Sequence, residues 1–280
     1  MKRLSPWDAD HGQRAVIGTD MLKDKCAVVT GSTSGIGLGI VEALASAGCN
    51  VVLNSFTDRP DDHALAEKLS QHHGVAARYI RADMAHGDDC EALIEQAAEA
   101  FGPVAILVNN AGIQHVAKVE EFPIAKWDAI LAINLSSAFR TIRASVPAMR
   151  AAGWGRIVNI ASAHGLTASP FKAAYVAAKH GLVGLTKTVA LELAEAGVAC
   201  NAICPGYVLT PLVEAQIADQ MKVHNLSRDQ VVREIMLQRQ PTRRFARVED
   251  IGKMAVFLCS DAAAQITGTT LSIDGGWTAL

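Results

Sequence analysis

Short apolar runs recur along the chain, and longer stretches with helical spacing of apolar residues separate them. Continuous apolar runs rich in β-branched residues are typical of strands that are covered on both faces. Such runs predict strands at Cys26–Thr30, Val51–Asn54, Ala76–Ile80 (the weakest), Val104–Asn109, Arg156–Ala161, Val198–Ile203 and Thr269–Ile273.

The stretches between these runs are rich in Ala, Leu and Glu. They predict helices at Ile36–Ala47, Asp61–His72, Asp88–Ala100, Ile124–Arg150, Ala173–Ala196 and Val248–Ser260. Strands that alternate with helices form βαβ units, in which a parallel sheet carries helices on both faces. We therefore expect an α/β fold over residues 21–280: one doubly wound, Rossmann-type domain with about seven strands.

Two segments break this alternation. Residues 1–20 show neither the apolar run of a strand nor the apolar spacing of a helix. We interpret them as an N-terminal extension of unknown role. Residues 207–245 form a helical, charge-rich insertion between the sixth and seventh strands. An insertion beyond the carboxyl ends of the strands lies where a substrate lid would sit. A solvated helical hairpin is the alternative for this segment.

Composition narrows the classes of function. Of the 280 residues, 50% are hydrophobic and 19% are charged, which suits a chain with a sizeable core. The 26 Lys and Arg residues against 28 Asp and Glu residues leave a net charge of −2. No positive excess is therefore present for binding nucleic acid through its phosphates. No stretch reaches the ~20 apolar residues of a membrane span, so no membrane partner is expected.

The six cysteines are scattered along the chain. Cys200 and Cys204 lie four residues apart, without the His or paired Cys-x-x-Cys of a zinc site. We expect no metal site, and we interpret the cysteines as buried, reduced thiols of a cytoplasmic protein. The start of the chain has no apolar core of a secretory signal, which agrees with that location.

A glycine-rich turn joins the first strand to the first helix. Gly31, Gly35 and Gly37 let the backbone approach a pyrophosphate, whose charge the helix N-terminus favours. A plain tight turn is the alternative, but the position after the first strand favours a dinucleotide site.

The residues after the second strand bear on which dinucleotide binds. Its end carries no acid for ribose hydroxyls, and Arg59 is the only nearby base for a 2′-phosphate. An uncharged pocket shaped by Asn54 or Phe56 favours NAD. Asp83, after the third strand, is placed either to accept a hydrogen bond from the adenine amine or to cap a turn.

Tyr175 and Lys179 lie four residues apart in a helical stretch, so both project from one face. A free tyrosine titrates near pKa ~10, and a neighbouring ammonium lowers that value by about 1–3 units. Ser162 lies thirteen residues before Tyr175, at the end of the fifth strand. Its hydroxyl is placed to hold a substrate oxygen beside the phenol. A surface Tyr–Lys pair is the alternative.

Together these motifs resemble the short-chain dehydrogenase/reductase family. The resemblance rests on Thr30-Gly31-x-x-x-Gly35-x-Gly37, Asn109-Asn110-Ala111-Gly112, Asn134, Ser162, Tyr175-x-x-x-Lys179 and Pro205-Gly206, in order and at family spacing. It implies that Asn134, Ser162, Tyr175 and Lys179 form a catalytic tetrad. Tyr175 would be the acid/base, Ser162 would orient the substrate oxygen, Lys179 would hold the nicotinamide ribose, and Asn134 would position a water.

The resemblance further implies the strand order 3-2-1-4-5-6-7 and a homotetramer. The cofactor contacts that we carry over from it are Gly31, Thr33, Gly35, Ile36, Gly37, Phe56, Asp83, Asn110, Gly112, Tyr175, Lys179 and Pro205.

Polar residues after the fourth and fifth strands and in the lid indicate a small carboxylate substrate. Several segments are similar to the bacterial D-3-hydroxybutyrate dehydrogenases, a group within the family. By that similarity, the carboxylate would be held by Gln114, His164, Lys172 and Gln216. That group commonly has Trp where this chain has Tyr207, which leaves more room near the substrate methyl group. Lys172 and Gln216 have the alternative of ordinary surface residues.

The expected reaction is the reversible, NAD-dependent oxidation of (R)-3-hydroxybutyrate to acetoacetate. The first alternative is another member of the family, acting with NADP on a 3-oxoacyl thioester, a sugar or a secondary alcohol. The second is a non-catalytic binding or scaffold protein, against which the filled tetrad counts.

Overall fold

Seven parallel strands form the centre of the structure, a computed structural model. It describes residues 22–280, apart from the side chains of Pro211, Leu212, Ala215, Gln216, Asp219 and Val223, and the predicted N-terminal extension lies outside the described residues. The sheet has the order β3-β2-β1-β4-β5-β6-β7, as the resemblance implied. The strands are β1 (Cys26–Val29), β2 (Asn50–Ser55), β3 (Ala77–Arg81), β4 (Val104–Asn109), β5 (Gly155–Ile160), β6 (Val198–Pro205) and β7 (Thr270–Ile273).

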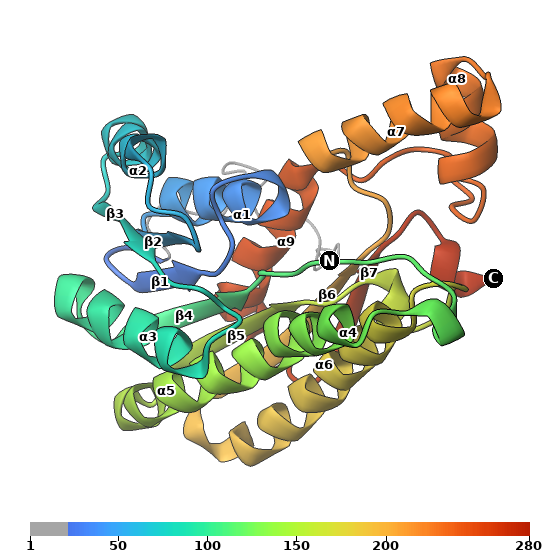
Figure 1. Cartoon of the computed structure of the whole chain (residues 1–280). Coiled ribbons are helices and arrows are strands. Elements are labelled where there is room, and N and C mark those ends of the chain that lie inside the picture. The colour runs from blue at the N-terminus through green and yellow to red at the C-terminus, as the bar shows by residue number, and fades with distance from the viewer. Residues whose placement is uncertain (1–21) are drawn as a thin grey trace, which may run out of the picture.

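Helices cover both faces of this sheet (Figure 1). On one face lie α1 (Gly35–Ser46), α2 (Pro60–His73) and α9 (Val248–Cys259), and on the other α3 (Gly87–Phe101), α4 (Ile124–Leu131), α5 (Ser137–Ala152) and α6 (Ala173–Glu192). Separate clusters of buried apolar side chains fill the two layers. The predicted doubly wound α/β fold is confirmed.

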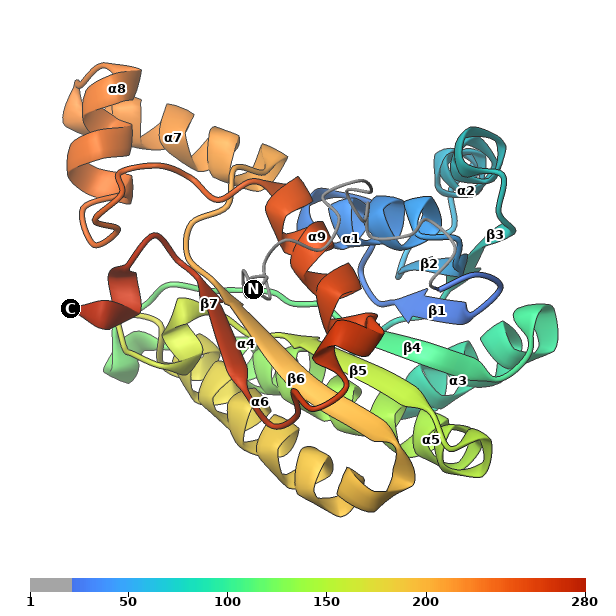
Figure 2. The ribbon, with the colours of Figure 1, turned by 180° about the vertical axis from the view of Figure 1, so that it is seen from behind.

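The close packing of α1 against α9 depends on two glycines. A Cβ atom at Gly252 would lie 2.5 Å from the carbonyl oxygen of Gly39, so a side chain there would push the two helices apart. Figure 2 shows α1 and α9 side by side on this face. Their contact fixes where α1 begins, and α1 begins at the glycine loop.

The prediction of one helix over Ile124–Arg150 needs a correction. A π-helical turn at Ala132–Ser136 separates α4 from α5. Within it, the Asn134 amide binds Ile113, which follows β4, accepting from its N–H and donating to its C=O, both at 2.9 Å. Such turns are frequent at functional sites, and no apolar period reveals one.

The segment predicted as a lid follows β6. It contains α7 (Pro211–His224), α8 (Arg228–Gln230) and a π-helical turn at Val231–Met236. Its two ends run side by side, because Val208 and Ala246 form a parallel bridge. The segment has its own cluster of buried residues, Ile217, Val231, Met236 and Leu237. It therefore packs on itself beyond the sheet (Figure 1).

Two expectations from composition can be compared with the structure. All six cysteines are free and buried, as predicted. Among residues 22–280, no helix has the length and apolar character that crossing a membrane requires.

Candidate active site

The glycine loop is held in place from the neighbouring strand β2. The side-chain oxygen of Asn54 accepts from the N–H of Gly31 at 3.1 Å, and its amide nitrogen donates to the carbonyls of Ile80 and Ala82, both at 3.1 Å. Asn54 is completely buried. Its role in this structure is therefore to position the loop, and the interpretation of Asn54 as a pocket wall is wrong.

The segment after β4 locks the same loop from the other side. The Asn110 amide nitrogen donates to the carbonyls of Thr30 and Gly31, at 2.9 and 2.8 Å. The Thr30 hydroxyl oxygen accepts from the backbone N–H groups of Asn110 and Ala111, both at 3.0 Å. Loop and segment meet where the sheet order reverses between β1 and β4, the place where doubly wound folds bind ligands.

Three of the predicted catalytic residues meet at the carboxyl end of β5. The Ser162 hydroxyl lies close enough to the Tyr175 phenol to act on its pKa, which it lowers against the larger effect of burial. Lys179, one helical turn after Tyr175 on α6, is 4% exposed and donates to the carbonyl of Ile160 at 2.7 Å. Its ammonium lies 5.7 Å from the centre of the Tyr175 ring.

Asn134, the fourth predicted catalytic residue, is hydrogen-bonded to the backbone after β4. It is 2% exposed, and its side-chain amide is engaged with the N–H and C=O of Ile113. The side chain therefore holds the segment after β4 against the π-helical turn. The carried-over role of positioning a water stays a prediction.

Aromatic rings enclose the space next to the Ser162–Tyr175 pair. The His164 ring contacts Tyr175 and Trp277 edge to face, with ring centres 5.9 and 5.0 Å apart. Tyr207 stacks on Trp277 at 5.7 Å. Nε2 of the His164 ring lies 2.9 Å from the Ser169 hydroxyl. The backbone N–H of His164 donates to Ser162 Oγ at 3.1 Å.

The remaining predicted substrate residues are placed differently. Lys172 is half-buried at the residue before α6, and its charge acts on His164. Gln114 is exposed in the segment after β4, and Gln216 lies on α7 with its side chain outside the described residues. The sequence analysis missed Ser169, Trp277 and Arg239, whose guanidinium donates to Ser169 at 3.3 Å. No local motif marks these three residues.

Comparisons with known proteins show the family to which this chain belongs. A family model described as enoyl-(acyl carrier protein) reductase matches residues 31–278. The chain is 54% identical to the D-beta-hydroxybutyrate dehydrogenase of Rhizobium meliloti (strain 1021), over 91% of this chain and 99% of that protein. It is 51% identical to the D-beta-hydroxybutyrate dehydrogenase of Cupriavidus necator, over 92% and 100%.

A solved structure from Sinorhizobium meliloti 1021, assigned to the short-chain alcohol dehydrogenases, matches with a TM-score of 0.82 and 37% identity. The match covers 93% of this chain and 98% of the other. The chain belongs to the short-chain dehydrogenase/reductase family. It is therefore an oxidoreductase, and the alternative of a family member that reduces a 3-oxoacyl thioester, a sugar or a secondary alcohol is less supported.

Membership of the short-chain dehydrogenase/reductase family implies a nicotinamide cofactor, and the glycine loop fits one. A Cβ atom at Gly37 would lie 2.5 Å from the Gly31 carbonyl oxygen, and Gly31 and Gly35 have φ of +60° and +56°. No side chain projects from these three glycines at the start of α1, so a ligand can approach the backbone there. The positive end of the helix dipole favours a pyrophosphate.

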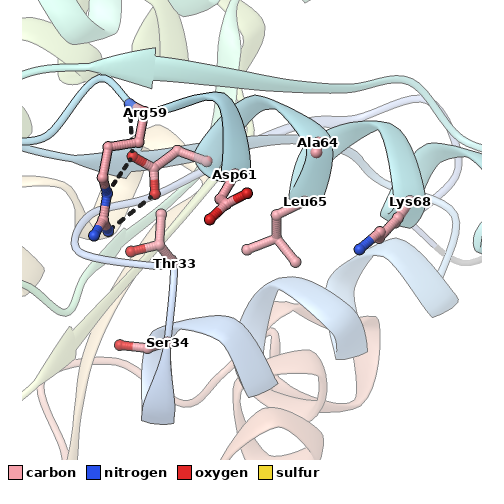
Figure 3. Close-up of a pocket in the computed structure, with 8 residues that line it drawn as sticks. Thr33, Ser34, Arg59, Asp61, Ala64, Leu65 and Lys68 are labelled. Carbon is pink, nitrogen blue, oxygen red and sulfur yellow. Dashed lines mark hydrogen bonds and ion pairs between the residues drawn. The ribbon is translucent and has the colours of Figure 1, made fainter.

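A cavity of about 320 Å³ separates this loop from α2 (Figure 3). Thr33 and Ser34 line it on the loop side, and Asp61 lines it from α2. The Arg59 guanidinium, at its edge, is bound to Asp62 through contacts of 3.5 and 3.4 Å. Arg59 is therefore already neutralised by its own helix.

Phe56 and Asp83, both predicted to contact the adenosine, differ from each other in exposure and bonding. Phe56 is 67% exposed just after β2, open to a ligand. Asp83 caps the turn after β3, since its Oδ1 accepts from the N–H of Ala85 at 2.9 Å. This is the alternative role that the sequence left open for Asp83.

Burial dominates the titration of Tyr175 and Lys179, the predicted acid/base pair. It raises the pKa of Tyr175, against which the hydrogen bond with Ser162 acts in the opposite direction. Burial also lowers the pKa of Lys179 to about 8. The expected lowering of the Tyr175 pKa by Lys179 is not found, because the ammonium is directed to the Ile160 carbonyl and desolvation is the larger effect.

Because of His164, the free energy of unfolding of this protein should fall in acid. Burial lowers its pKa to about 4 from 6.5, with smaller contributions from the charges of Lys172, Arg239 and His180. Between about pH 6.5 and 4 the unfolded chain therefore binds a proton that the folded chain does not, so stability falls as the pH falls. At pH 5 the cost is about 2 kcal/mol relative to pH 7.

A His164→Gln variant removes this proton uptake. Thermal unfolding at pH 7 and pH 5 should show a smaller loss of melting temperature in the variant than in the wild type. An equal loss in both proteins would mean that His164 titrates normally in the folded chain.

Proposed function

We propose that this chain is an NAD-dependent dehydrogenase that interconverts (R)-3-hydroxybutyrate and acetoacetate. The observation that carries the proposal is the contact of a neutral His164 with the Tyr175 ring, at a place where the charge of Lys172 acts on His164. A cation and a neutral donor next to an acid/base suit a substrate with a carboxylate close to its hydroxyl group. The names of two relatives, with identities of 54% and 51%, support the same substrate.

The four tetrad residues divide the chemistry between them. Ser162 binds the substrate oxygen and orients the carbinol, and Tyr175 takes the hydroxyl proton during oxidation and returns it during reduction. A nicotinamide cofactor held at the glycine loop and at Lys179 would supply the acceptor for the hydride of the carbinol carbon. Lys179, fixed by the Ile160 carbonyl, holds the nicotinamide ribose, and Asn134 keeps the segment after β4 in place.

The surroundings of the glycine loop support NAD over NADP. A 2′-phosphate needs a free cation, and Arg59 is paired with Asp62. Asp61 adds a negative charge to the same cavity near Thr33, where its field opposes a phosphate, and the Lys68 cation lines the cavity about two helical turns farther along α2 (Figure 3). Phe56 offers an uncharged surface for adenosine.

For the substrate we propose contacts of Gln114, His164, Lys172 and Gln216 with the carboxylate. The stacked Tyr207 and Trp277 rings would form the wall next to the substrate methyl group. The segment 207–245 would close over the bound substrate and bring Gln216 to the carboxylate, which would exclude water from the reaction.

The proposal extends to the oligomeric state of the protein and to its location in the cell. We propose a homotetramer, a state that would cover the exposed apolar residues Val119, Ile124, Phe139 and Leu191. We propose the cytoplasm as its location, since six free, buried thiols suit a reducing compartment.

The test is NADH formation, measured at 340 nm, with (R)-3-hydroxybutyrate and NAD. We expect turnover with this pair, and rates at least tenfold lower with NADP or with the (S) enantiomer. Faster turnover with NADP and a neutral alcohol or thioester would favour the alternative members of the family. If protein that binds NADH gives no NADH formation with (R)-3-hydroxybutyrate, the proposed substrate is wrong.

A further inference from the structure

Arg239 joins the end of the 207–245 segment to the loop before α6. Its Nη1 donates to the carbonyl of Ala168 at 3.1 Å and to the hydroxyl of Ser169 at 3.3 Å. About 70 residues of chain separate the partners, so this contact is purely tertiary. It brings a guanidinium to the loop that lies between Ser162 and Tyr175 in the sequence.

Ser169 connects this guanidinium to the substrate side of the site. Its hydroxyl lies 2.9 Å from Nε2 of His164, which is 5% exposed and contacts Tyr175. Arginine can only donate, so the Ser169 oxygen accepts from Arg239. In the tautomer in which Ser169 donates its proton to Nε2, Nδ1 of His164 carries the ring proton and is a donor for a ligand.

The charges in this region are unbalanced. The Arg239 charge lowers the pKa of Lys172, after the larger effect of burial, and it acts in the same direction on His164 and Tyr207. His164, with a pKa of about 4, is neutral at neutral pH. The positive charge therefore belongs to Lys172 and Arg239, and their mutual repulsion is relieved when an anion binds between them.

We propose that Arg239 is a specificity-determining residue that supplies, with Lys172, the second positive charge for a carboxylate-bearing substrate. This inference rests on the proposed function and extends it, because Arg239 lies outside the residues that the family resemblance assigned. Its hydrogen bonds to Ala168 and Ser169 hold the guanidinium in position, and its exposed side chain leaves further N–H donors free for an anion. A bidentate guanidinium contact would favour carboxylates over neutral alcohols.

The experiment compares Arg239→Gln with the wild type on (R)-3-hydroxybutyrate and on its uncharged methyl ester. We expect the KM for the acid to rise about tenfold, with kcat and the KM for the ester within about twofold. The dependence of kcat/KM on ionic strength should be shallower in the variant. Arg239→Lys should recover part of the affinity, and Lys172→Ala should raise the KM for the acid in the same way.

Arg233→Gln is the matched control. It removes the same charge from an exposed position of the same segment, and it should leave all these constants unchanged. An equal rise in KM for acid and ester would mean that Arg239 only supports the fold of the segment, which overturns the proposal. An unchanged KM for the acid overturns it as well.

A carboxylate-binding measurement keeps the inference separate from the proposed reaction. Malonate at constant ionic strength, with NADH present, should raise the melting temperature of the wild type more than that of Arg239→Gln. If the wild type fails to oxidise the acid but shows this difference, the substrate is wrong and the Arg239 assignment stands. Equal responses to malonate, including no response in either protein, overturn the assignment.

Discussion

A Tyr175→Phe variant is expected to lose about 10³-fold in kcat for (R)-3-hydroxybutyrate oxidation, while its affinity for NADH stays within about twofold of the wild type. In the proposed reaction the phenol hydroxyl exchanges the proton, and Ser162 acts on its pKa. Phe keeps the ring that contacts His164, so the packing is retained. Initial rates at 340 nm and NADH fluorescence titration measure the two quantities.

His180→Phe is the control for changes on the same helix, because His180 is exposed and bonds only its own helix at Val176 among its described contacts. That variant should keep wild-type activity. A Tyr175→Phe enzyme with more than a tenth of the wild-type kcat would move the acid/base role to another group.

A Gly37→Ala variant is expected to weaken NADH binding at least tenfold and to lower the free energy of unfolding by about 1–3 kcal/mol. The added Cβ would lie 2.5 Å from the Gly31 carbonyl oxygen, 2.5 Å from Asn110 Nδ2 and 2.8 Å from Ser32 Cα. Two of these atoms are backbone, so the loop itself must move. The movement would distort the surface that faces the pyrophosphate.

Gly184→Ala provides the matched control. Gly184 lies on α6 with open space around its Cβ position, and alanine is the better helix former by about 1 kcal/mol. This variant should bind NADH normally and unfold at the same or a higher temperature. Unchanged NADH affinity in Gly37→Ala would show that the loop adapts to the methyl group and that its fit to a pyrophosphate is loose.

The strands, most helices and the Tyr175–Lys179 pair could be predicted from local patterns. A buried parallel strand has the same apolar signature whatever its neighbours are, so six of the seven predicted runs were clear from the start. Tyr175 and Lys179 share a helix, and one turn of spacing places both on one face before any packing is known. The glycine loop is equally local, because strand, turn and helix follow directly in the chain.

The roles of polar side chains near the loop could not be read in this way. Asn54 is a plausible pocket residue until β3 lies beside β2 and supplies the Ile80 and Ala82 carbonyls that engage it. Arg59 is a candidate phosphate ligand until Asp62 binds it. The π-helical turn at Ala132–Ser136 also depends on a distant partner, the backbone of Ile113.

The sequence by itself determined the fold class, the strand order through its family resemblance, the position of the glycine loop and the tetrad. The fold class and the glycine loop depend on hydrophobic period and on residues close together in the chain, whereas the strand order and the predicted tetrad came from the family resemblance. The tertiary structure decided which polar side chains are hydrogen-bonded to the protein's own backbone and which face the site. Arg239 shows the difference: its hydrogen bonds join segments about 70 residues apart, and only folding brings that charge to His164 and Lys172.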